Sequence, residues 1–198
     1  MSGNPSPLSF PLHAQPARRA VYVDRDGTVN PDLRYLKDAE RLEVFRGVAE
    51  AVRLLHQHGY LVVCVTNQSG IERGFYTVQD VERIHRRVNE ILRTEAAAID
   101  AFYYCPHASE TGCRCRKPGT ELFERAERDL GIVRSGSAII GDRGLDIEAG
   151  NRLGLLTALV PSPGHQAEVD QELHVRGVRP DILAPTMRAA AARILAIG

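Results

Sequence analysis

Short unbroken apolar runs alternate along the chain with longer segments in which apolar residues recur every three or four positions. Unbroken apolar runs bounded by glycine or polar residues are typical of buried strands, and the wider spacing is typical of amphipathic helices. The pattern predicts strands at residues 21–23, 60–65, 101–104, 138–140, 157–160 and 181–183. It predicts helices at residues 48–58, 77–94, 120–130, 146–153 and 186–197. Their alternation predicts an α/β fold, a doubly wound and mostly parallel sheet with helices on both faces.

Two segments fall outside this alternation. Residues 1–19 contain four prolines but neither a charged start nor an apolar core, so they do not fit a secretory signal and are predicted to be a disordered leader. Residues 161–180 are polar and are predicted to be a mobile connection. Residues 20–198 are expected to form a single domain, because a chain of this length can bury a proper core.

The charge balance narrows the classes of function. Among the 198 residues, 25 Lys and Arg offset 25 Asp and Glu. A neutral chain without a basic, aromatic-rich face is not typical of a nucleic-acid binder or of a protein that binds anionic membranes. No apolar run approaches the roughly 18 residues of a membrane span. We therefore expect a cytoplasmic protein without a nucleic-acid or membrane partner and, because no large exposed apolar element is evident, a monomer.

The first predicted strand ends in two carboxylates one residue apart, Asp24 and Asp26, followed by Gly27 and Thr28. In an open parallel sheet, ligands bind beyond the carboxyl ends of the strands. Two carboxylates this close repel each other. Folding that brings them together is costly unless a cation lies between them or the two groups have different roles. Phosphoryl transfer fits the pair: one carboxylate attacks phosphorus, the other handles the leaving-group proton, and Mg²⁺ offsets the negative charge. The alternative is a strand end capped by solvated aspartates.

Two further predicted strands end in polar residues with the same polarity. Residues 66–70, Thr-Asn-Gln-Ser-Gly, follow the second strand, and their hydroxyl and backbone N–H groups can hold phosphate oxygens, although such residues are also ordinary in turns. Asp142 and Asp146 follow the fourth strand. Because carboxylates are the ligands that Mg²⁺ prefers, these strand ends together favour a metal-assisted phosphate site.

Three of the four cysteines lie close together, with one histidine among them. In a reducing compartment such a cluster favours a metal over a disulfide, and its composition fits a closed, tetrahedral structural zinc site. A redox cluster or a chance grouping are the alternatives. The predicted zinc ligands are Cys105, His107, Cys113 and Cys115. The remaining cysteine, Cys64, lies inside an apolar run and is expected to be a core residue.

Taken in order, these motifs resemble the four motifs of the haloacid-dehalogenase-like phosphatases. The matching positions are Asp24 to Thr28, Thr66, Lys117, and Asp142 with Asp146. Residues 24–30, 66–74, 104–107 and 113–118 further resemble the zinc-containing branch of the family, which holds D-glycero-D-manno-heptose 1,7-bisphosphate phosphatases and the histidinol-phosphatase domain. The resemblance extends over about residues 20–160 and implies a capless phosphatase with a zinc-held loop, since no segment between the motifs is long enough for a separate cap domain.

The resemblance implies a role for each matching residue. Asp24 would be the nucleophile that forms an aspartyl phosphate, and Asp26 would protonate the leaving alkoxide and then activate water. Thr66 and Lys117 would bind the phosphoryl oxygens. Magnesium would be held by Asp24, the backbone carbonyl of Asp26, and Asp142, with Asp146 orienting these ligands. Zinc would hold a rigid loop that aims Arg116 and Lys117 at the site.

The family also places substrate contacts on three loops and on Arg116. The implied substrate-binding residues are Asp32, Leu33, Arg34, Tyr35, Asn67, Gln68, Ser69, Arg116 and Arg143. For the loop residues, a solvated surface position is the alternative. Arg34 departs from the Asp-x-Gly-Tyr form usual in heptose-bisphosphate enzymes, and residues 117–120 form a shorter segment than is common there. The five-residue spacing between His107 and Cys113 also occurs in the histidinol-phosphatase branch, whereas residues 69–74 favour the heptose branch.

Cations on several loops predict a substrate with a phosphate at both ends. They are Arg34, Lys37, Arg73, Arg114 and Arg116. We therefore predict a Mg²⁺-dependent phosphatase, also carrying Zn²⁺, that converts a small sugar bisphosphate, D-glycero-D-manno-heptose 1,7-bisphosphate, to the 1-phosphate. The alternative is a histidinol-phosphate phosphatase or another small-molecule phosphatase of the same branch. A zinc-ribbon binding module and an inactive scaffold fit less well, because the chain is neutral and keeps the complete set of acids.

Overall fold

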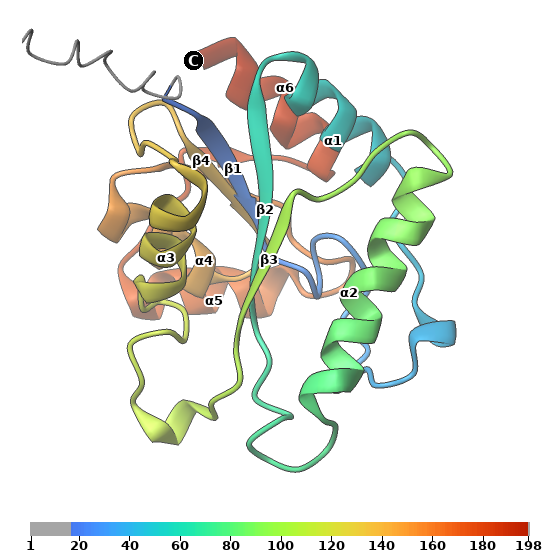
Figure 1. The fold of residues 1–198 in the computed structure, drawn as a ribbon. Coiled ribbons are helices and arrows are strands. Elements are labelled where there is room, and N and C mark those ends of the chain that lie inside the picture. Colours follow the sequence, from blue (N-terminus) through green and yellow to red (C-terminus); the bar gives the residue numbers. More distant parts are fainter. Residues whose placement is uncertain (1–16, 198) are drawn as a thin grey trace, which may run out of the picture.

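Six parallel strands form one sheet in the order β3-β2-β1-β4-β5-β6. Figure 1 labels the first four strands of this order. The computed structural model describes residues 17–197. The strands are β1 (Arg19–Val23), β2 (Tyr60–Asn67), β3 (Ala101–Cys105), β4 (Ala138–Gly141), β5 (Leu156–Leu159) and β6 (Ile182–Leu183). This order and polarity confirm the predicted doubly wound sheet.

Helices cover both faces of the sheet, as the alternation of apolar patterns predicts (Figure 1). They are α1 (Val48–Gln57), α2 (Val78–Arg93), α3 (Glu121–Leu130), α4 (Gly144–Leu153), α5 (Gln166–Arg176) and α6 (Met187–Ile197), with short 3-10 turns η1 (Ala39–Arg41) and η2 (Ser109–Thr111). Helices α1, α2 and α6 pack on one face, and α3 and α4 pack on the other. No helix within residues 17–197 is long and apolar enough to cross a membrane.

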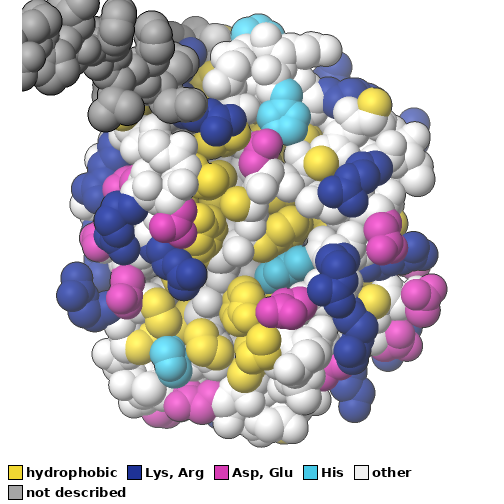
Figure 2. All heavy atoms as spheres, viewed as in Figure 1, with side chains coloured by type: hydrophobic (Ala, Val, Ile, Leu, Met, Phe, Trp, Pro, Cys, Tyr) yellow, Lys and Arg dark blue, Asp and Glu magenta, His cyan; other side chains and the backbone are white. Residues whose placement is uncertain are grey.

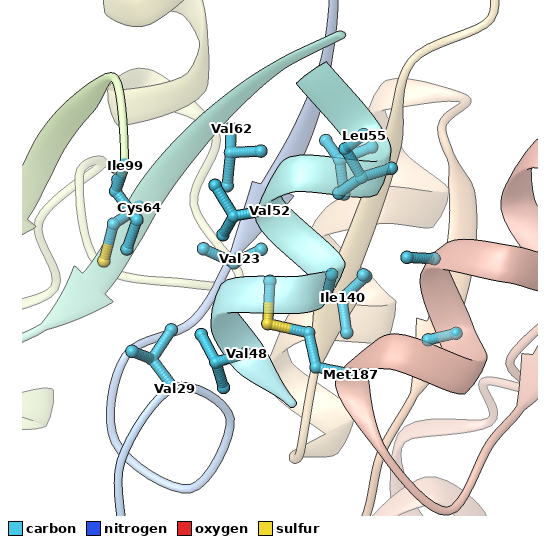
Figure 3. Close-up of a cluster of buried hydrophobic side chains, with 14 of the residues drawn as sticks. Val23, Val29, Val48, Val52, Leu55, Val62, Cys64, Ile99, Ile140 and Met187 are labelled. Atoms are coloured by element: carbon cyan, nitrogen blue, oxygen red, sulfur yellow. The ribbon is translucent and has the colours of Figure 1, made fainter. Parts of the chain in front are cut away.

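The central strand β1 is buried on both sides because alternate residues face opposite helix layers. Val21 and Val23 belong to the cluster packed under α1 and α6, which Figure 3 shows in close-up. Ala20 and Tyr22 face the other layer, where the Tyr22 ring meets the edge of Phe123 with centroids 5.0 Å apart. Burying each large apolar side chain here contributes roughly 1.5–3 kcal/mol to folding. The sheet is thus a rigid base for the residues at its carboxyl edge.

Local interactions define the start of helix α2 and the end of helix α1. Thr77 and Asp80 form a reciprocal capping box at the start of α2, with the Thr77 side chain accepting from the Asp80 backbone. Gly59 follows the end of α1 with a φ of +78°, the left-handed conformation that ends helices. Cys64 is fully buried in the core, as predicted.

The prediction that residues 161–180 form a mobile connection is wrong. Helix α5 occupies most of this segment and ends at Gly177, whose φ is +64°. Val169 is fully buried against Ile147 and Leu159. Because α5 buries so narrow an apolar stripe, its sequence lacks the strong helical periodicity seen elsewhere.

The predicted disordered leader lies almost entirely outside the described residues. Strand β1 begins at Arg19, and Arg18 forms a bridge to Ile132, so the backbone is already paired at the end of that segment. For residues 1–16 the prediction stays a prediction.

Candidate active site

The site lies where the strand order changes direction, between β1 and its neighbour β4. The backbone N–H of Asp24, just after β1, donates to Ile140 O of β4 at 3.0 Å. Asp142 follows the end of β4. In an open parallel sheet this switch point leaves a crevice beyond the strand ends, and ligands bind there. The predicted meeting of the two acidic strand ends is confirmed.

Three carboxylates converge at this point. Asp24, Asp142 and Asp146 can each offer one oxygen such that all three oxygens lie within 4.8 Å of one another. The Oδ1 atoms of Asp24 and Asp142 are both buried. Asp142 Oδ1 has no hydrogen-bond partner, whereas Asp24 Oδ1 lies 2.8 Å from the ammonium group of Lys117. Burial first, and then the neighbouring carboxylates, raise the pKa of Asp142 to about 8. Burial and Asp146 raise the pKa of Asp24 to about 6, although Lys117 acts in the opposite direction. Carboxylate oxygens gathered under this repulsion could hold a divalent cation, which would favour their ionised forms.

Lys117 is buried among these acids. Its Nζ lies 2.8 Å from Asp24 Oδ1 and 2.5 Å from Asp146 Oδ1. Burial alone would lower the pKa of Lys117, but Asp146 and Asp24 raise it above its usual value, so the ammonium group is charged. The Asn67 side chain fixes the Lys117 backbone, accepting from its N–H at 3.0 Å and donating to its carbonyl at 3.2 Å. Asn67 therefore positions a cation, a role that sequence reasoning did not assign to it.

Asp26 is held by an arginine that sequence reasoning missed. Arg25 Nε donates to Asp26 Oδ1 at 3.1 Å, and Nη2 donates to Oδ2 at 2.6 Å. Asn30 and Gln68 each donate a further hydrogen bond to this carboxylate at 2.9 Å. Burial would raise the pKa of Asp26, but Arg25 and these hydrogen bonds lower it below its usual value. Asp26 is therefore ionised in the free protein and ready to accept a proton.

Gly27 is required by the packing of this loop. Its φ is +90°, and a Cβ built on it would lie 2.0 Å from Asp142 Oδ2. The Ser162 hydroxyl lies in the same region and is within hydrogen-bond distance of Gly27 O, at 3.0 Å, and of Asp142 Oδ2, at 3.1 Å. Ser162 comes from the segment predicted to be mobile, which is why its contribution was missed.

A cavity of about 410 Å³ opens onto the carboxylates and brings together nearly all the predicted site residues. Its lining includes Asp24, Asp26, Asp32, Arg34, Tyr35, Thr66, Asn67, Gln68, Ser69, Arg116, Lys117, Asp142, Arg143 and Asp146. It also includes Arg25, Leu36, Tyr76 and Leu145, which were not predicted. Leu33 is the exception, since it is 43% exposed and faces a separate shallow hollow with Pro31.

Three of the loop cations lie elsewhere. Arg73 forms a two-point ion pair with Glu110 at 2.8 and 2.9 Å and does not line the cavity. Lys37 is also absent from the lining, and Arg114 borders a neighbouring hollow beside the cysteine cluster. Of the five loop cations named from the sequence, Arg34 and Arg116 line the cavity.

The Cys/His cluster is assembled as predicted. Five sulfur–sulfur and sulfur–nitrogen distances among Cys105, His107, Cys113 and Cys115 span 3.1–3.6 Å. Tetrahedral thiolates about 2.3 Å from a zinc ion would be about 3.8 Å apart, so the four groups fit such an ion. None of the cysteines forms a disulfide. The Glu72 side chain accepts from the Ala108 backbone and from Thr111 Oγ1, which ties the cluster's loop to the loop after β2.

Comparisons with known proteins agree with this geometry. The family model described as polynucleotide kinase 3 phosphatase matches residues 28–145, and the one described as HAD-hydrolase-like matches residues 114–190. A D-glycero-beta-D-manno-heptose-1,7-bisphosphate 7-phosphatase of Haemophilus ducreyi is 34% identical over 162 residues, covering 78% of this chain and 89% of that protein. The chain belongs to the haloacid-dehalogenase-like phosphatases. It is a phosphoric monoester hydrolase.

Two further relatives of this haloacid-dehalogenase-like phosphatase extend the comparison. A D-glycero-D-manno-heptose-1,7-bisphosphate 7-phosphatase of Chlorobaculum tepidum is 37% identical over 169 residues, covering 79% of this chain and 84% of that protein. The crystal structure of D,D-heptose 1,7-bisphosphate phosphatase from B. bronchiseptica, complexed with magnesium and phosphate, superposes with a TM-score of 0.79 at 27% identity. It covers 91% of this chain and 99% of that chain, so the two share the whole fold.

Proposed function

We propose that this chain is a magnesium-dependent phosphatase that hydrolyses the 7-phosphate of D-glycero-D-manno-heptose 1,7-bisphosphate through an aspartyl-phosphate intermediate. One observation carries the proposal: Lys117 lies 2.8 Å from the buried Oδ1 of Asp24, and the buried Oδ1 of Asp142, which has no hydrogen-bond partner, lines the same cavity. A phosphate dianion would not approach three carboxylates unaided. Mg²⁺ bound by Asp24, Asp142 and the Asp26 carbonyl would offset their charge and polarise the phosphoryl oxygens.

The side chains suit an in-line displacement. Asp24 attacks phosphorus, and the bond to the leaving oxygen breaks while Lys117 and Thr66 bind the phosphoryl oxygens. Asp26 delivers a proton to the leaving oxygen and later removes one from the attacking water. Arg25 favours the ionised form needed for the second task. The negative charge of a bound phosphate raises the proton affinity of Asp26, so that Asp26 binds a proton from the solvent before the first task.

Zinc is proposed as a structural ion in the cluster of Cys105, His107, Cys113 and Cys115. Four protein ligands leave no open coordination position, so this ion would take no part in the reaction. It would hold the loop that presents Arg116, whose Nη1 donates to the backbone carbonyl of His107 at 3.2 Å. Three cysteines that bind a metal instead of forming disulfides fit a reducing compartment, and we propose that the protein works in the cytoplasm. We also propose that it is a monomer.

The choice of substrate rests on the named activity of the relatives and on the charges at the cavity. A nucleic-acid substrate, suggested by the polynucleotide kinase 3 phosphatase match, fits less well. On the face shown in Figure 2, Lys and Arg side chains are interspersed with Asp and Glu, and the chain as a whole is neutral. A polyanion would require a continuous basic surface, whereas a small bisphosphate requires a few cations at a cavity.

The test is phosphate release by the purified zinc-containing protein with Mg²⁺. The substrates would be both anomers of heptose 1,7-bisphosphate, fructose 1,6-bisphosphate, histidinol phosphate, an aryl phosphate and a 3′-phosphorylated oligonucleotide, with Asp24→Asn as the blank. We expect kcat/KM for one heptose anomer to exceed the others at least about tenfold, or about 1.4 kcal/mol in transition-state binding. A preference for histidinol phosphate would favour the alternative function, and activity that survives in Asp24→Asn would refute the mechanism.

A further inference from the structure

Residues 32–35, at the rim of the cavity, have an unusual backbone. Arg34 and Tyr35 have φ angles of 45° and 60°, in the left-handed region that favours glycine. The Asp32 side chain accepts a hydrogen bond from the Arg34 backbone N–H at 2.9 Å and so closes the turn. Such strain persists only where the surroundings maintain it, and it is concentrated at ligand sites. An arginine in a position suited to glycine therefore calls for a functional explanation.

Aromatic contacts hold this turn against the loop that follows β2. The Tyr35 ring centroid lies 4.4 Å from that of Phe75 and 6.3 Å from that of Tyr76. The Tyr76 hydroxyl donates to Gln68 at 2.7 Å, and Gln68 donates to Asp26 at 2.9 Å. The turn is thus connected to the catalytic aspartates through consecutive contacts, which gives Arg34 a defined place at the rim.

Five cationic side chains line the cavity, and Arg34 differs from the other four. Three form ion pairs within the protein: Arg25 with Asp26, Lys117 with Asp24 and Asp146, and Arg143 with Glu172. Arg116 donates to the backbone carbonyl of His107. Within residues 17–197, the Arg34 guanidinium forms no ion pair or hydrogen bond. Its charge and its planar set of donors are available to a ligand.

We propose that Arg34 binds the second phosphate of a bisphosphate substrate, the one that is not hydrolysed. This inference rests on the proposed function, because the hydrolysed phosphate then occupies the base of the cavity at Asp24 and Lys117. A guanidinium recognises phosphate through two parallel charge-assisted hydrogen bonds. Arg34 would therefore select bisphosphates over monophosphates that share the same reacting end.

A structural role towards helix α5 is the competing explanation. Glu168 of that helix has a lowered pKa, chiefly through His165 and to a smaller extent through Arg143 and Arg34. If Arg34 served mainly to stabilise α5 electrostatically, Glu168→Gln would reproduce the effect of losing Arg34. Glu168→Gln is therefore the matched control, since it removes that attraction and leaves the Arg34 guanidinium in place.

The experiment measures kcat and KM for heptose 1,7-bisphosphate and for heptose 7-phosphate in wild type, Arg34→Gly, Arg34→Lys and Glu168→Gln. In Arg34→Gly, we expect KM for the bisphosphate to rise at least about tenfold, with kcat and both constants for the monophosphate little changed. Arg34→Lys should recover part of the loss, because it keeps the charge but not the paired donors. Glu168→Gln should behave as wild type. Thermal unfolding should show no loss of Tm in Arg34→Gly, because glycine adopts this φ readily.

Several results would overturn the proposal. Equal losses on both substrates, a loss reproduced by Glu168→Gln, or a lower Tm in Arg34→Gly would each assign Arg34 a structural role. An unchanged preference for the bisphosphate in Arg34→Gly would show that another group binds the second phosphate. A wild-type protein without activity on either heptose phosphate would instead refute the proposed function, and the inference with it, before any variant is compared.

Discussion

His85 is a buried histidine whose surroundings predict how stability changes with pH. Its ring stacks on Phe102 with centroids 4.5 Å apart, and its Nε2 lies 3.4 Å from Nη1 of Arg25. Because a guanidinium nitrogen can only donate, the imidazole must accept through Nε2 and is neutral. Burial first, and then the charge of Arg25, lower the pKa of His85 to about 3.

The sign and size of the effect follow from the two states. In the unfolded chain the histidine pKa is about 6.5, so as pH falls the unfolded state binds the proton first. Above about pH 6.5, His85 therefore does not lower the free energy of unfolding. Between about pH 6.5 and pH 3, protonation of the histidine in the unfolded chain lowers the free energy of unfolding progressively. Each pH unit in that window lowers the free energy of unfolding by about 1.4 kcal/mol. The protein should therefore be about 2 kcal/mol less stable at pH 5 than at pH 8.

The assay is urea unfolding of wild type and His85→Gln at pH 8, 6.5 and 5. Glutamine can accept the hydrogen bond from Arg25 but does not titrate. Asp24 and Asp142 also have shifted pKa values, yet their contributions are present in both proteins and cancel in the difference. We expect the stability of His85→Gln relative to wild type to improve by about 2 kcal/mol between pH 8 and pH 5.

A constant difference between the two proteins, within about 0.5 kcal/mol over this pH range, would refute the reasoning. It would mean that His85 has the same pKa in the folded and unfolded states, so that burial and the charge of Arg25 do not disfavour its protonated form.

Three other substitutions test contacts of the site. Gly27→Ala should lower the free energy of unfolding by about 2 kcal/mol or more in urea titrations, because of its positive φ and the closeness of Asp142. Asn67→Ala removes two hydrogen bonds to Lys117, so stability should fall by about 1–3 kcal/mol and kcat should fall more than KM rises; unchanged kinetics would exclude a positioning role. Glu72→Ala should speed zinc loss to a chelating dye, and equal rates would show that the loop holds the metal unaided.

The strand ends explain why so much of the site could be predicted from the sequence. Parallel strands with buried faces are visible as unbroken apolar runs, and their carboxyl ends meet at one edge. Asp24, Thr66 and Asp142 each follow such a run, so their convergence required no knowledge of long-range packing. The Cys/His cluster was equally local, because all four groups lie within one short segment.

The missed residues contact the predicted ones directly, but the packing that brings them into place is not visible in the local sequence pattern. Arg25 looked like a spacer between two aspartates, and its burial depends on α2 supplying His85 as a partner. Ser162 contacts Asp142 from the segment that leads into α5. Because α5 buries little apolar surface, its sequence has little helical periodicity and did not predict an ordered segment here. Leu33 lies outside the cavity that its neighbours line, and the left-handed turn at Arg34 and Tyr35 beside it is not encoded by residue type.

The charges at the base of the cavity explain why the site requires further cations. Arg25 and Asp26 form a neutral pair. When all are ionised, Asp24, Asp142, Asp146 and Lys117 carry a formal charge of minus two, which one divalent cation neutralises. The phosphate to be hydrolysed then brings its own two negative charges, and a second phosphate brings up to two more. Arg34 and Arg116 line the cavity without an ion pair and can meet these charges. The exposed position of Arg34, in contrast to the buried Lys117, favours a substrate that is charged at both ends.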